Sequence, residues 1–331
     1  MTHRDSLCCL QYTSPKEGPH MQKSLTIATR KSPLALWQAY HVRDRLEAMH
    51  PDLTVELLEM TTQGDERLDV SLQKIGGKGV FVKELETALY DGRADLAVHS
   101  LKDVPMELPE GLELCCFTAR ETPFDAVVTR DGLAPWANFD AIPEGAHLGT
   151  SSLRRMAQIR ALRPDLKLSP VRGNLGTRLR KLDSGEFDGL VLAAAGLHRL
   201  DMAHRIAFET APEDVLPACG QGILGIEIRS SDNETRGCVM PLQDTVGARA
   251  GRCERALNRH LNGGCQVPIA AYAIERDDSL WLRALVGSAD CGTLLCAEGL
   301  GSLDDPEALG VSVAEDLVAQ GARELLAQAG L

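Results

Sequence analysis

The chain has 331 residues, of which 44% are hydrophobic and 25% are charged, and it carries a formal net charge of −12. That length allows two or three domains of about 100–200 residues each, and the composition is ordinary for a globular protein with a substantial buried core. An acidic chain with only 4% aromatic residues is a poor candidate for a nucleic-acid-binding protein, which normally has a basic surface and often aromatic stacking platforms.

Apolar segments and cysteines indicate where in the cell the protein is expected. The sequence contains no apolar stretch of about 18 residues, so we expect no membrane span and no membrane partner. Residues 1–20 lack the apolar segment of a signal peptide, and we predict a disordered tail there. Ten cysteines include no CxxC pair and no zinc-finger spacing, so we expect no metal site and mostly free thiols in a reducing, cytoplasmic compartment.

The first predicted elements form a strand–helix–strand unit. Ser24–Thr29 is short and apolar, as expected of a strand. Ser32 then stands where a helix cap belongs, with Pro33 at the first helical position, and apolar residues recur every three or four positions as far as Met49. A second strand is predicted at Leu53–Met60.

This alternation continues along the chain. The next predicted elements are helix Val80–Tyr90, strand Ala94–Val98, strand His147–Gly149, a capped helix at 150–162, strand Lys167–Val171, helix Leu175–Ser184 and strand Gly189–Ala193. Such a pattern indicates α/β lobes with largely parallel sheets. Stretches rich in Pro and Gly at Glu121–Phe124 and Val215–Gly222 are predicted to cross between lobes, and strand Ile223–Arg229 to return to the first sheet.

The character of the sequence changes after about residue 241. A helix at Val246–Leu261 precedes three short strands and a final helix from about Pro306 to Gln328, which together predict a small α+β domain. We therefore expect three domains after the tail: residues 21–120 with 219–240, residues 121–218, and residues 241–331.

Polar side chains gather at three predicted junctions between a strand and a helix. The junctions hold Arg30 and Ser32; Thr150, Ser151 and Ser152 followed by Arg154 and Arg155; and Arg172 with Asn174. Ligands of open α/β sheets bind at the carboxyl ends of strands, where helix amides, hydroxyls and guanidinium groups suit carboxylates or phosphates. Ordinary helix capping would explain the serines equally well.

The run 65–79 is polar and rich in glycine. Its segment Ile75–Gly79 resembles a phosphate-binding loop only loosely, because Gly79 and not Ser or Thr follows Lys78, and this disfavours nucleotide hydrolysis. Two readings of the run stay open: a lid that carries Lys74 and Lys78, or a solvated loop.

Two single residues could carry chemistry. Asp103 follows a predicted strand and could stabilise a developing cation, although alone it could equally be a turn residue, and nearby His99 could be a structural histidine. Cys265 follows two glycines, which can expose a thiol at a loop tip. Cys219, beside another glycine-rich run, is a second candidate thiol.

These features occur within ordered motifs that resemble one family, the porphobilinogen deaminases (hydroxymethylbilane synthases). The resemblance runs from about Leu25 to Leu326, in the stretches IATRKSPLALWQA, GGKGVFVKELE, ADLAVHSLKDVP, GTSSLRR, VRGNLGTRLRKL, LAAAGLHRL, PACGQGILGIE and LNGGCQVPI. It implies two lobes like those of periplasmic binding proteins, with the active site between them, and a third domain that carries the cysteine.

The resemblance also implies roles for residues. Cys265 matches the position that holds a dipyrromethane cofactor through a thioether, and Asp103 matches the catalytic carboxylate. The positions matched to cofactor binding are Ser32, Lys102, Thr150, Ser152, Arg154, Arg155, Arg172 and Gly173. Those matched to substrate binding are Arg30, Ser32, Arg155, Arg172, Arg178 and Arg199.

The implied activity deaminates four porphobilinogen molecules, joins them head to tail on the covalent cofactor, and releases 1-hydroxymethylbilane by hydrolysis. Each porphobilinogen brings an acetate and a propionate, so a protein of net charge −12 must gather arginines locally to hold the growing chain. We expect a monomer that needs neither metal nor nucleotide. The alternative is a non-enzymatic two-lobed protein that binds a small anion, which would account for the arginines but not for LNGGCQVPI or the third domain.

Overall fold

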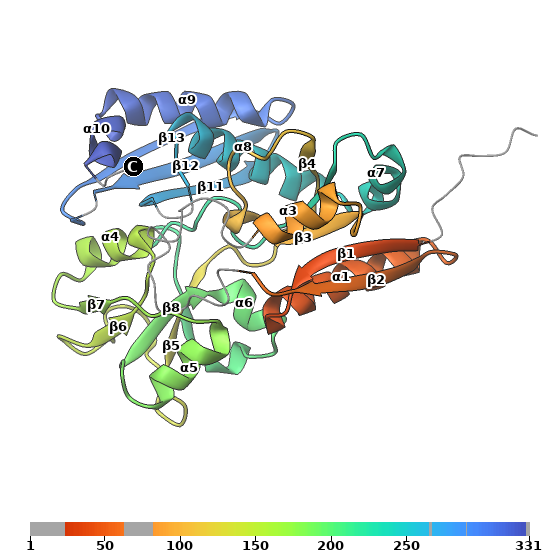
Figure 1. The fold of residues 1–331 in the computed structure, drawn as a ribbon. Helices are drawn as coiled ribbons and strands as arrows, with labels where there is room; N and C mark the ends of the chain where they lie inside the picture. Colours follow the sequence, from red (N-terminus) through yellow and green to blue (C-terminus); the bar gives the residue numbers. More distant parts are fainter. Residues whose placement is uncertain (1–23, 63–81, 265–266, 289, 329–331) are drawn as a thin grey trace, which may run out of the picture.

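The computed structural model describes residues 24–62, 82–264, 267–288 and 290–328, arranged as two lobes and a third domain (Figure 1). Cys265, Lys74, Lys78 and the predicted tail lie outside the described residues. In Figure 1 the third domain, coloured teal to blue, lies at the upper left, above the second lobe.

The first lobe contains a five-stranded sheet with the order β2-β1-β3-β10-β4. Strand β1 pairs in parallel with β2 and β3, whereas β10 runs antiparallel to both β3 and β4. The strands are β1 (Ser24–Arg30), β2 (Thr54–Met60), β3 (Leu96–Ser100), β4 (Leu112–Phe117) and β10 (Leu224–Arg229), and the helices are α1 (Pro33–Met49), α3 (Lys83–Tyr90) and α7 (Asn233–Val239).

The second lobe repeats this plan with the order β7-β6-β8-β5-β9, in which β5 is antiparallel to both of its neighbours. Its strands are β5 (Asp125–Thr129), β6 (His147–Gly149), β7 (Lys167–Ser169), β8 (Gly189–Ala193) and β9 (Ile206–Glu209), and its helices are α4 (Leu153–Leu162), α5 (Leu175–Asp183) and α6 (Ala194–Arg199).

The α/β class is confirmed, but the prediction of largely parallel sheets is wrong. Two of the four pairings in each sheet are antiparallel. The reason lies in the crossovers: β5 and β10 each enter a sheet directly from the other lobe, at 118–124 and 210–223, without the packed helix that makes successive strands parallel. The predicted return of the later strand to the first sheet is confirmed.

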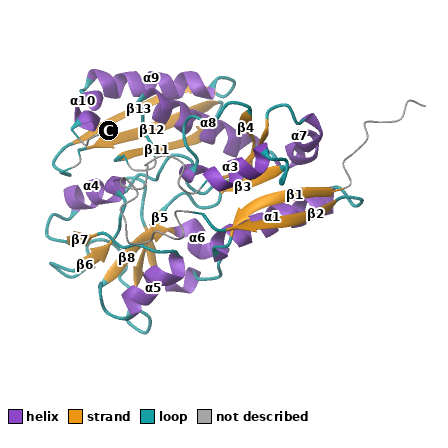
Figure 2. Cartoon of the chain, viewed as in Figure 1, coloured by secondary structure: helices purple, strands orange, loops and turns teal. Residues whose placement is uncertain are grey.

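The third domain packs two helices on one face of an antiparallel sheet (Figure 2). The sheet has the order β11-β12-β13, formed by Ile269–Arg276, Ser279–Gly287 and Leu294–Ser302. Helices α8 (Thr245–His260) and α9 (Pro306–Ala319) bury Cys253, Leu257 and Val313 in one core with the sheet. The opposite face packs Ala270 and Leu285 against Leu216 of the second crossover.

The predicted single C-terminal helix is wrong in one respect. Helix α9 ends at Ala319, and a separate helix α10 (Ala322–Ala327) follows Gly321. Gly321 has φ of +98°, a left-handed conformation that an α-helix cannot continue through. The chain thereby turns so that Ala322 and Leu326 join the core of the third domain.

Local sequence explains why α1 begins where it does. The Ser32 side chain accepts a hydrogen bond from the backbone N–H of Ala35 at 3.4 Å, and Pro33 follows it, so the predicted cap is confirmed. Helix α1 then buries Ala39, Val42 and Leu46 against the first sheet. No helix in the described part of the chain is long and apolar enough to cross a membrane.

Candidate active site

A pocket of about 80 Å³ lies where two parallel strands of the first lobe end. Strand β1 ends at Arg30, just before the cap Ser32, and β3 ends at Ser100, just before the short 3₁₀ helix η2 (Leu101–Asp103). Arg30, Ser32, His99, Ser100 and Asp103 all line this pocket. The structure thus brings the predicted site residue Asp103 together with Arg30 and Ser32, which are distant from it in sequence.

The two ends of η2 point their side chains into different surroundings. Asp103 is exposed at the pocket. The Lys102 ammonium instead donates a hydrogen bond to Oε1 of Gln221 on the second crossover, at 3.3 Å. Burial lowers the pKa of Lys102 to about 8, although the charge of Asp103 opposes this. Lys102 is therefore mostly charged at neutral pH and loses its charge as the pH rises through about 8.

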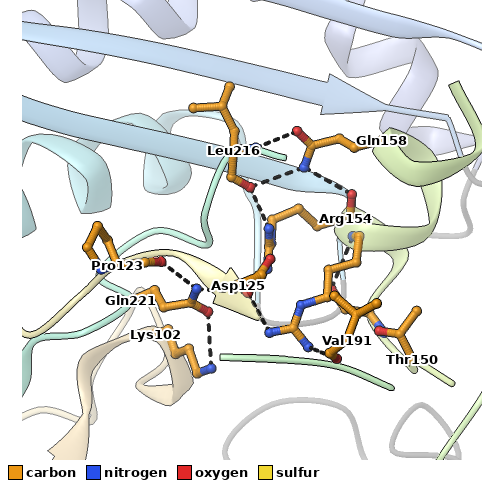
Figure 3. Close-up of polar contacts among 11 residues, drawn as sticks. Lys102, Pro123, Asp125, Thr150, Arg154, Gln158, Val191, Leu216 and Gln221 are labelled. Atoms are coloured by element: carbon orange, nitrogen blue, oxygen red, sulfur yellow. Dashed lines mark hydrogen bonds and ion pairs between the residues drawn. The ribbon is translucent and has the colours of Figure 1, made fainter. Parts of the chain in front are cut away.

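A buried carboxylate organises the second lobe behind this pocket (Figure 3). Asp125, the first residue of β5, is fully buried. Its oxygens accept hydrogen bonds from Arg154 at 2.8 Å, Arg155 at 2.7 Å and Gln221 at 2.9 Å. Burial alone would raise the pKa of Asp125, but the two guanidinium groups hold it well below its usual range.

Arg154 is committed to contacts within the protein. Besides Asp125, it donates from Nη1 to the carbonyl of Leu216 at 2.5 Å, and the same carbonyl accepts from Gln158 at 3.1 Å. The Gln158 Oε1 accepts in turn from the Leu216 N–H at 2.7 Å. Both terminal nitrogens of Arg154 thus tie α4 to β5 and to the second crossover, so a contact with the cofactor stays a prediction for this residue.

Arg155 has one N–H donor that is not used within the described part of the protein. It donates from Nη2 to Asp125 and from Nη1 to the carbonyl of Val191 at 3.0 Å. Its Nε is buried and has no hydrogen-bond partner among the described residues. An unpaired buried donor is costly unless another group satisfies it, and a ligand carboxylate beside Arg155 would do so.

The other second-lobe residues follow the ends of β6 and β7. The Ser152 side chain caps α4 by accepting from the N–H of Arg155, and Thr150 Oγ1 accepts from the N–H of Ser152 at 3.3 Å. Gly173 has φ of +112°, and the guanidinium Nε of Arg178 donates to its carbonyl at 2.8 Å. The positive φ favours glycine at this turn.

The charge of these residues is concentrated. Burial lowers the pKa of Arg178, the positive charges of Arg155 and Arg172 lower it further, and the negative charge of Asp103 opposes them. The charges of the same two residues also shift the pKa of Lys102, which Asp103 raises and Arg155 lowers. The exposed carboxylate of the first lobe and the arginines of the second therefore share one electrostatic environment, with more positive than negative charge, which suits a ligand that carries several carboxylates.

Arg199 lies at the end of α6 and is not among the residues that line the pocket of Asp103. It donates from Nη2 to the carbonyl of Gly222 at 2.7 Å and stacks on Trp37 of α1, with 5.7 Å from Cζ to the ring centroid. Burial lowers the pKa of Arg199 to about 10. It joins both lobes and the crossover between them, and its contact with substrate stays a prediction.

Reasoning from the sequence missed Asp125, Gln221 and the partner of His99, which is Glu227 of β10. Gln221 lies inside the motif PACGQGILGIE, and Asp125 is a lone charge at the start of the apolar run DAVVT, so both left a weak signal. The alternative thiol, Cys219, is buried, and burial raises its pKa to about 12, which disfavours the reactive thiolate.

Two family models match the chain. Residues 25–237 match the family model described as porphobilinogen deaminase, dipyromethane cofactor binding domain, and residues 248–319 match the C-terminal domain of porphobilinogen deaminase.

Among solved structures, the chain is similar to the periplasmic VFT2 domain of Bordetella pertussis BvgS, with 16% identity, a TM-score of 0.40, and coverage of 66% of this chain and 85% of that one. It is also similar to the aliphatic sulphonate binding protein SsuA of Escherichia coli, with 14% identity, a TM-score of 0.37, and coverage of 73% and 71%. The two family models together span most of the chain, which therefore belongs to the porphobilinogen deaminase family.

Proposed function

We propose that this chain carries out the family's hydroxymethylbilane synthase reaction with Asp103 as the carboxylate at the reacting centre and Cys265 as the anchor of the dipyrromethane cofactor. The observation that carries the proposal is the setting of Asp103. It is exposed in the same pocket as Arg30, and its charge acts on Lys102 and Arg178.

The residues present fit the cofactor. Its carboxylates need several cationic or hydroxyl donors, and the buried Nε of Arg155 is a donor that lacks a partner among the described residues. When bound, the cofactor supplies a covalently held primer with a free pyrrole carbon. The residues that would hold it are Cys265, Ser32, Lys102, Thr150, Ser152, Arg155, Arg172 and Gly173, with Arg154 acting through its bonds to Asp125.

Asp103 would act on the charge that develops on the substrate. When ammonia leaves the aminomethyl group of porphobilinogen, the remaining pyrrole is an electron-poor cation. A carboxylate fixed beside it lowers the energy of that cation and can accept a hydrogen bond from the pyrrole N–H. Arg30, Arg172, Arg178 and Arg199 would hold the acetate and propionate groups, because a guanidinium fork binds a carboxylate at two points.

Three further assignments belong to this proposal. A cytoplasmic location is supported by the seven described cysteines, none of which forms a disulfide with another described residue. A monomer is the simplest state, because one chain supplies all of the proposed site residues. Lys74 and Lys78 are proposed to contact substrate from a lid, and both lie outside the described residues.

The alternative function, binding of a small anion without catalysis, would give the third domain no role.

Intact-mass measurement tests the anchor. Active protein should carry an adduct the size of two pyrrole units, Cys265→Ser should lose it, and Cys296→Ser, which changes an exposed cysteine of the third domain, should keep it. An unmodified mass in active protein contradicts the mechanism.

Turnover tests Asp103. Asp103→Asn should keep the fold and the Cys265 thiol but lose at least about 100-fold in kcat, because charge stabilisation of this kind is typically worth that much. Asp140→Asn, at an exposed site of the second lobe, should turn over normally. Ammonia release by Asp103→Asn at the rate of the unsubstituted protein removes Asp103 from its role.

A further inference from the structure

A buried histidine–carboxylate pair lies beneath the reaction pocket. His99 of β3 lines the same pocket as Asp103 but is only 5% exposed. Its Nε2 lies 2.8 Å from Oε2 of Glu227, a fully buried residue of the neighbouring strand β10. The antiparallel pairing of β3 with β10 places the two side chains together, although 128 positions separate them in sequence.

This contact fixes what the ring can offer to the pocket. A carboxylate accepts hydrogen bonds, so in the neutral ring the proton sits on Nε2 and points at Glu227. Any polar contact of His99 with a molecule in the pocket must then use Nδ1, which in this tautomer is an acceptor. Because His99 lines the pocket, a neutral ring held this way can act as a base toward a molecule there, with a carboxylate on its other nitrogen.

Several charged or titratable groups surround the pair. Oε1 of Glu227 has no hydrogen-bond partner among the described residues. Glu86 of α3, only 8% exposed, has its pKa raised to about 7 by burial and by the charge of Glu227, while His99 opposes the rise. The other groups that face the cluster are Tyr90 of α3, Arg255 of α8, and Arg30 and Asp103 at the pocket.

We propose that His99 is the base that removes the pyrrole proton at each coupling step, and that Glu227 is a positioning residue that orients its ring and stabilises the imidazolium. The proposal rests on the assignment of the Asp103 pocket to the reaction. It also answers a need of the chemistry, because a carboxylate that stabilises the cation is poorly placed to take up a proton at the same moment.

Each coupling breaks one C–N bond and one C–H bond and forms one C–C bond. The C–N bond of porphobilinogen breaks, and ammonia leaves with the bonding pair. A C–C bond forms between the resulting methylene carbon and the free α-carbon of the pyrrole at the end of the growing chain. The C–H bond of that α-carbon then breaks, its electrons return to the ring, and the proton passes to Nδ1 of His99. The proton is finally given to ammonia, which departs as ammonium.

An isotope experiment on the holoenzyme tests this role. Single turnovers are measured with porphobilinogen that carries hydrogen or deuterium at the free α-carbon. The couplings after the first are compared, because the first breaks a C–H bond of the unlabelled cofactor. In His99→Gln we expect the coupling rate to fall by about 100-fold, the size typical of general-base catalysis, and a primary deuterium effect to appear that is absent from the unsubstituted protein. A merely structural histidine would slow the reaction without making C–H cleavage limiting.

A matched pair in the second lobe supplies the control. His198 Nε2 lies 2.8 Å from Glu209 Oε1, the same distance as in the buried pair, but both residues are partly exposed and neither lines the pocket. Glu227→Gln keeps an acceptor for Nε2 and removes the charge, so the acid limb of its pH–rate profile should move to lower pH. Glu209→Gln should leave that limb in place.

The possible outcomes are distinguishable. A slowed His99→Gln without a deuterium effect, or a Glu227→Gln profile identical to that of Glu209→Gln, overturns the role of His99 while leaving Asp103 in its own. Normal turnover in Asp103→Asn would overturn the assignment of the pocket itself. If His99→Gln fails to show a cooperative melting transition, Glu227→Gln decides the question alone, because an unmoved acid limb contradicts the proposal.

Discussion

The Lys102 ammonium of the first lobe donates to the side-chain amide oxygen of Gln221, on the second crossover, at 3.3 Å. The amide nitrogen of Gln221 donates to Asp125 at 2.9 Å and to the carbonyl of Pro123 at 2.5 Å. Because an ammonium can only donate and a carboxylate can only accept, the amide has a single orientation that satisfies both neighbours. Gln221 therefore couples the residue before Asp103 to the carboxylate that holds Arg154 and Arg155.

Replacing Gln221 should cost stability. Gln221→Leu removes one acceptor from Lys102 and one donor from Asp125, both in buried surroundings, so the free energy of unfolding should fall by about 1–3 kcal/mol. Gln320→Leu is the control, because that exposed side chain makes a single bond to the Cys296 carbonyl at 3.0 Å, and it should change stability by less than about 0.5 kcal/mol. Equal values in urea unfolding would show that the bridge is not stabilising.

Lys102 should confer an alkaline limit on ligand binding. A lysine is charged below its pKa, and burial lowers the pKa of Lys102 to about 8, so its charge is lost as the pH rises from 7 to 9. If Lys102 helps to hold carboxylates, KM for porphobilinogen should rise over this range. Lys102→Arg, which stays charged, should not show the rise. If KM rises equally in both proteins, the loss of charge on Lys102 is not the cause of the rise.

Asp125 should be the most costly single carboxylate to remove from the second lobe. Asp125→Asn leaves Arg154 and Arg155 buried without a counter-charge, so we expect a loss of roughly 3–5 kcal/mol in urea unfolding at pH 7. Asp183→Asn breaks the ion pair with Arg205, in which the carboxylate is 38% exposed, and should cost at most about 1 kcal/mol.

The same carboxylate predicts an acid limit. Since the folded-state pKa of Asp125 is depressed, its contribution is present above the unfolded value of 3.8 and is lost as the pH falls through the folded value. The difference in stability between the unsubstituted protein and Asp125→Asn should therefore be constant above about pH 5 and shrink below pH 3.8. A difference that persists at acid pH would mean that charge is not its source.

The sequence predicted correctly those helices and strands that depend only on neighbouring residues. The cap at Ser32 and the helix after it depend on neighbouring residues, and so does the strand Gly189–Ala193, which the structure has with the predicted bounds. The antiparallel pairings of β5 and β10 depend instead on where the chain re-enters a sheet, which no local periodicity contains. The break at Gly321 was visible only as a single glycine inside an otherwise helical pattern.

The site shows the same division. Arg30, Ser32 and Asp103 belong to motifs at strand ends, so their meeting in one pocket follows from the α/β pattern. The contacts of Asp125 with Arg154 and Arg155, and of Glu227 with His99, join segments from 29 to 128 residues apart. In the sequence, each of these residues is explained equally well as a cap, a turn or a structural residue, so only the tertiary structure reveals the contacts.

Glu86 should make the protein less stable as the pH rises through neutrality. Burial and the charge of Glu227 raise the pKa of Glu86 from 4.5 to about 7. The folded state then binds more protons than the unfolded state between these values, so the free energy of unfolding falls as the pH increases from about 4.5 to 7 and recovers none of the loss above that. The loss should be on the order of 3 kcal/mol at pH 8.

Thermal unfolding of Glu86→Gln over pH 5–8 measures this effect. Glutamine cannot ionise, so the variant should gain in Tm relative to the unsubstituted protein as the pH rises, with the largest gain at pH 8. Glu56→Gln, at an exposed position of β2, should follow the unsubstituted protein at every pH. A gain of Glu86→Gln at pH 5 as large as that at pH 8 would mean that packing, and not the proton on Glu86, produces the difference.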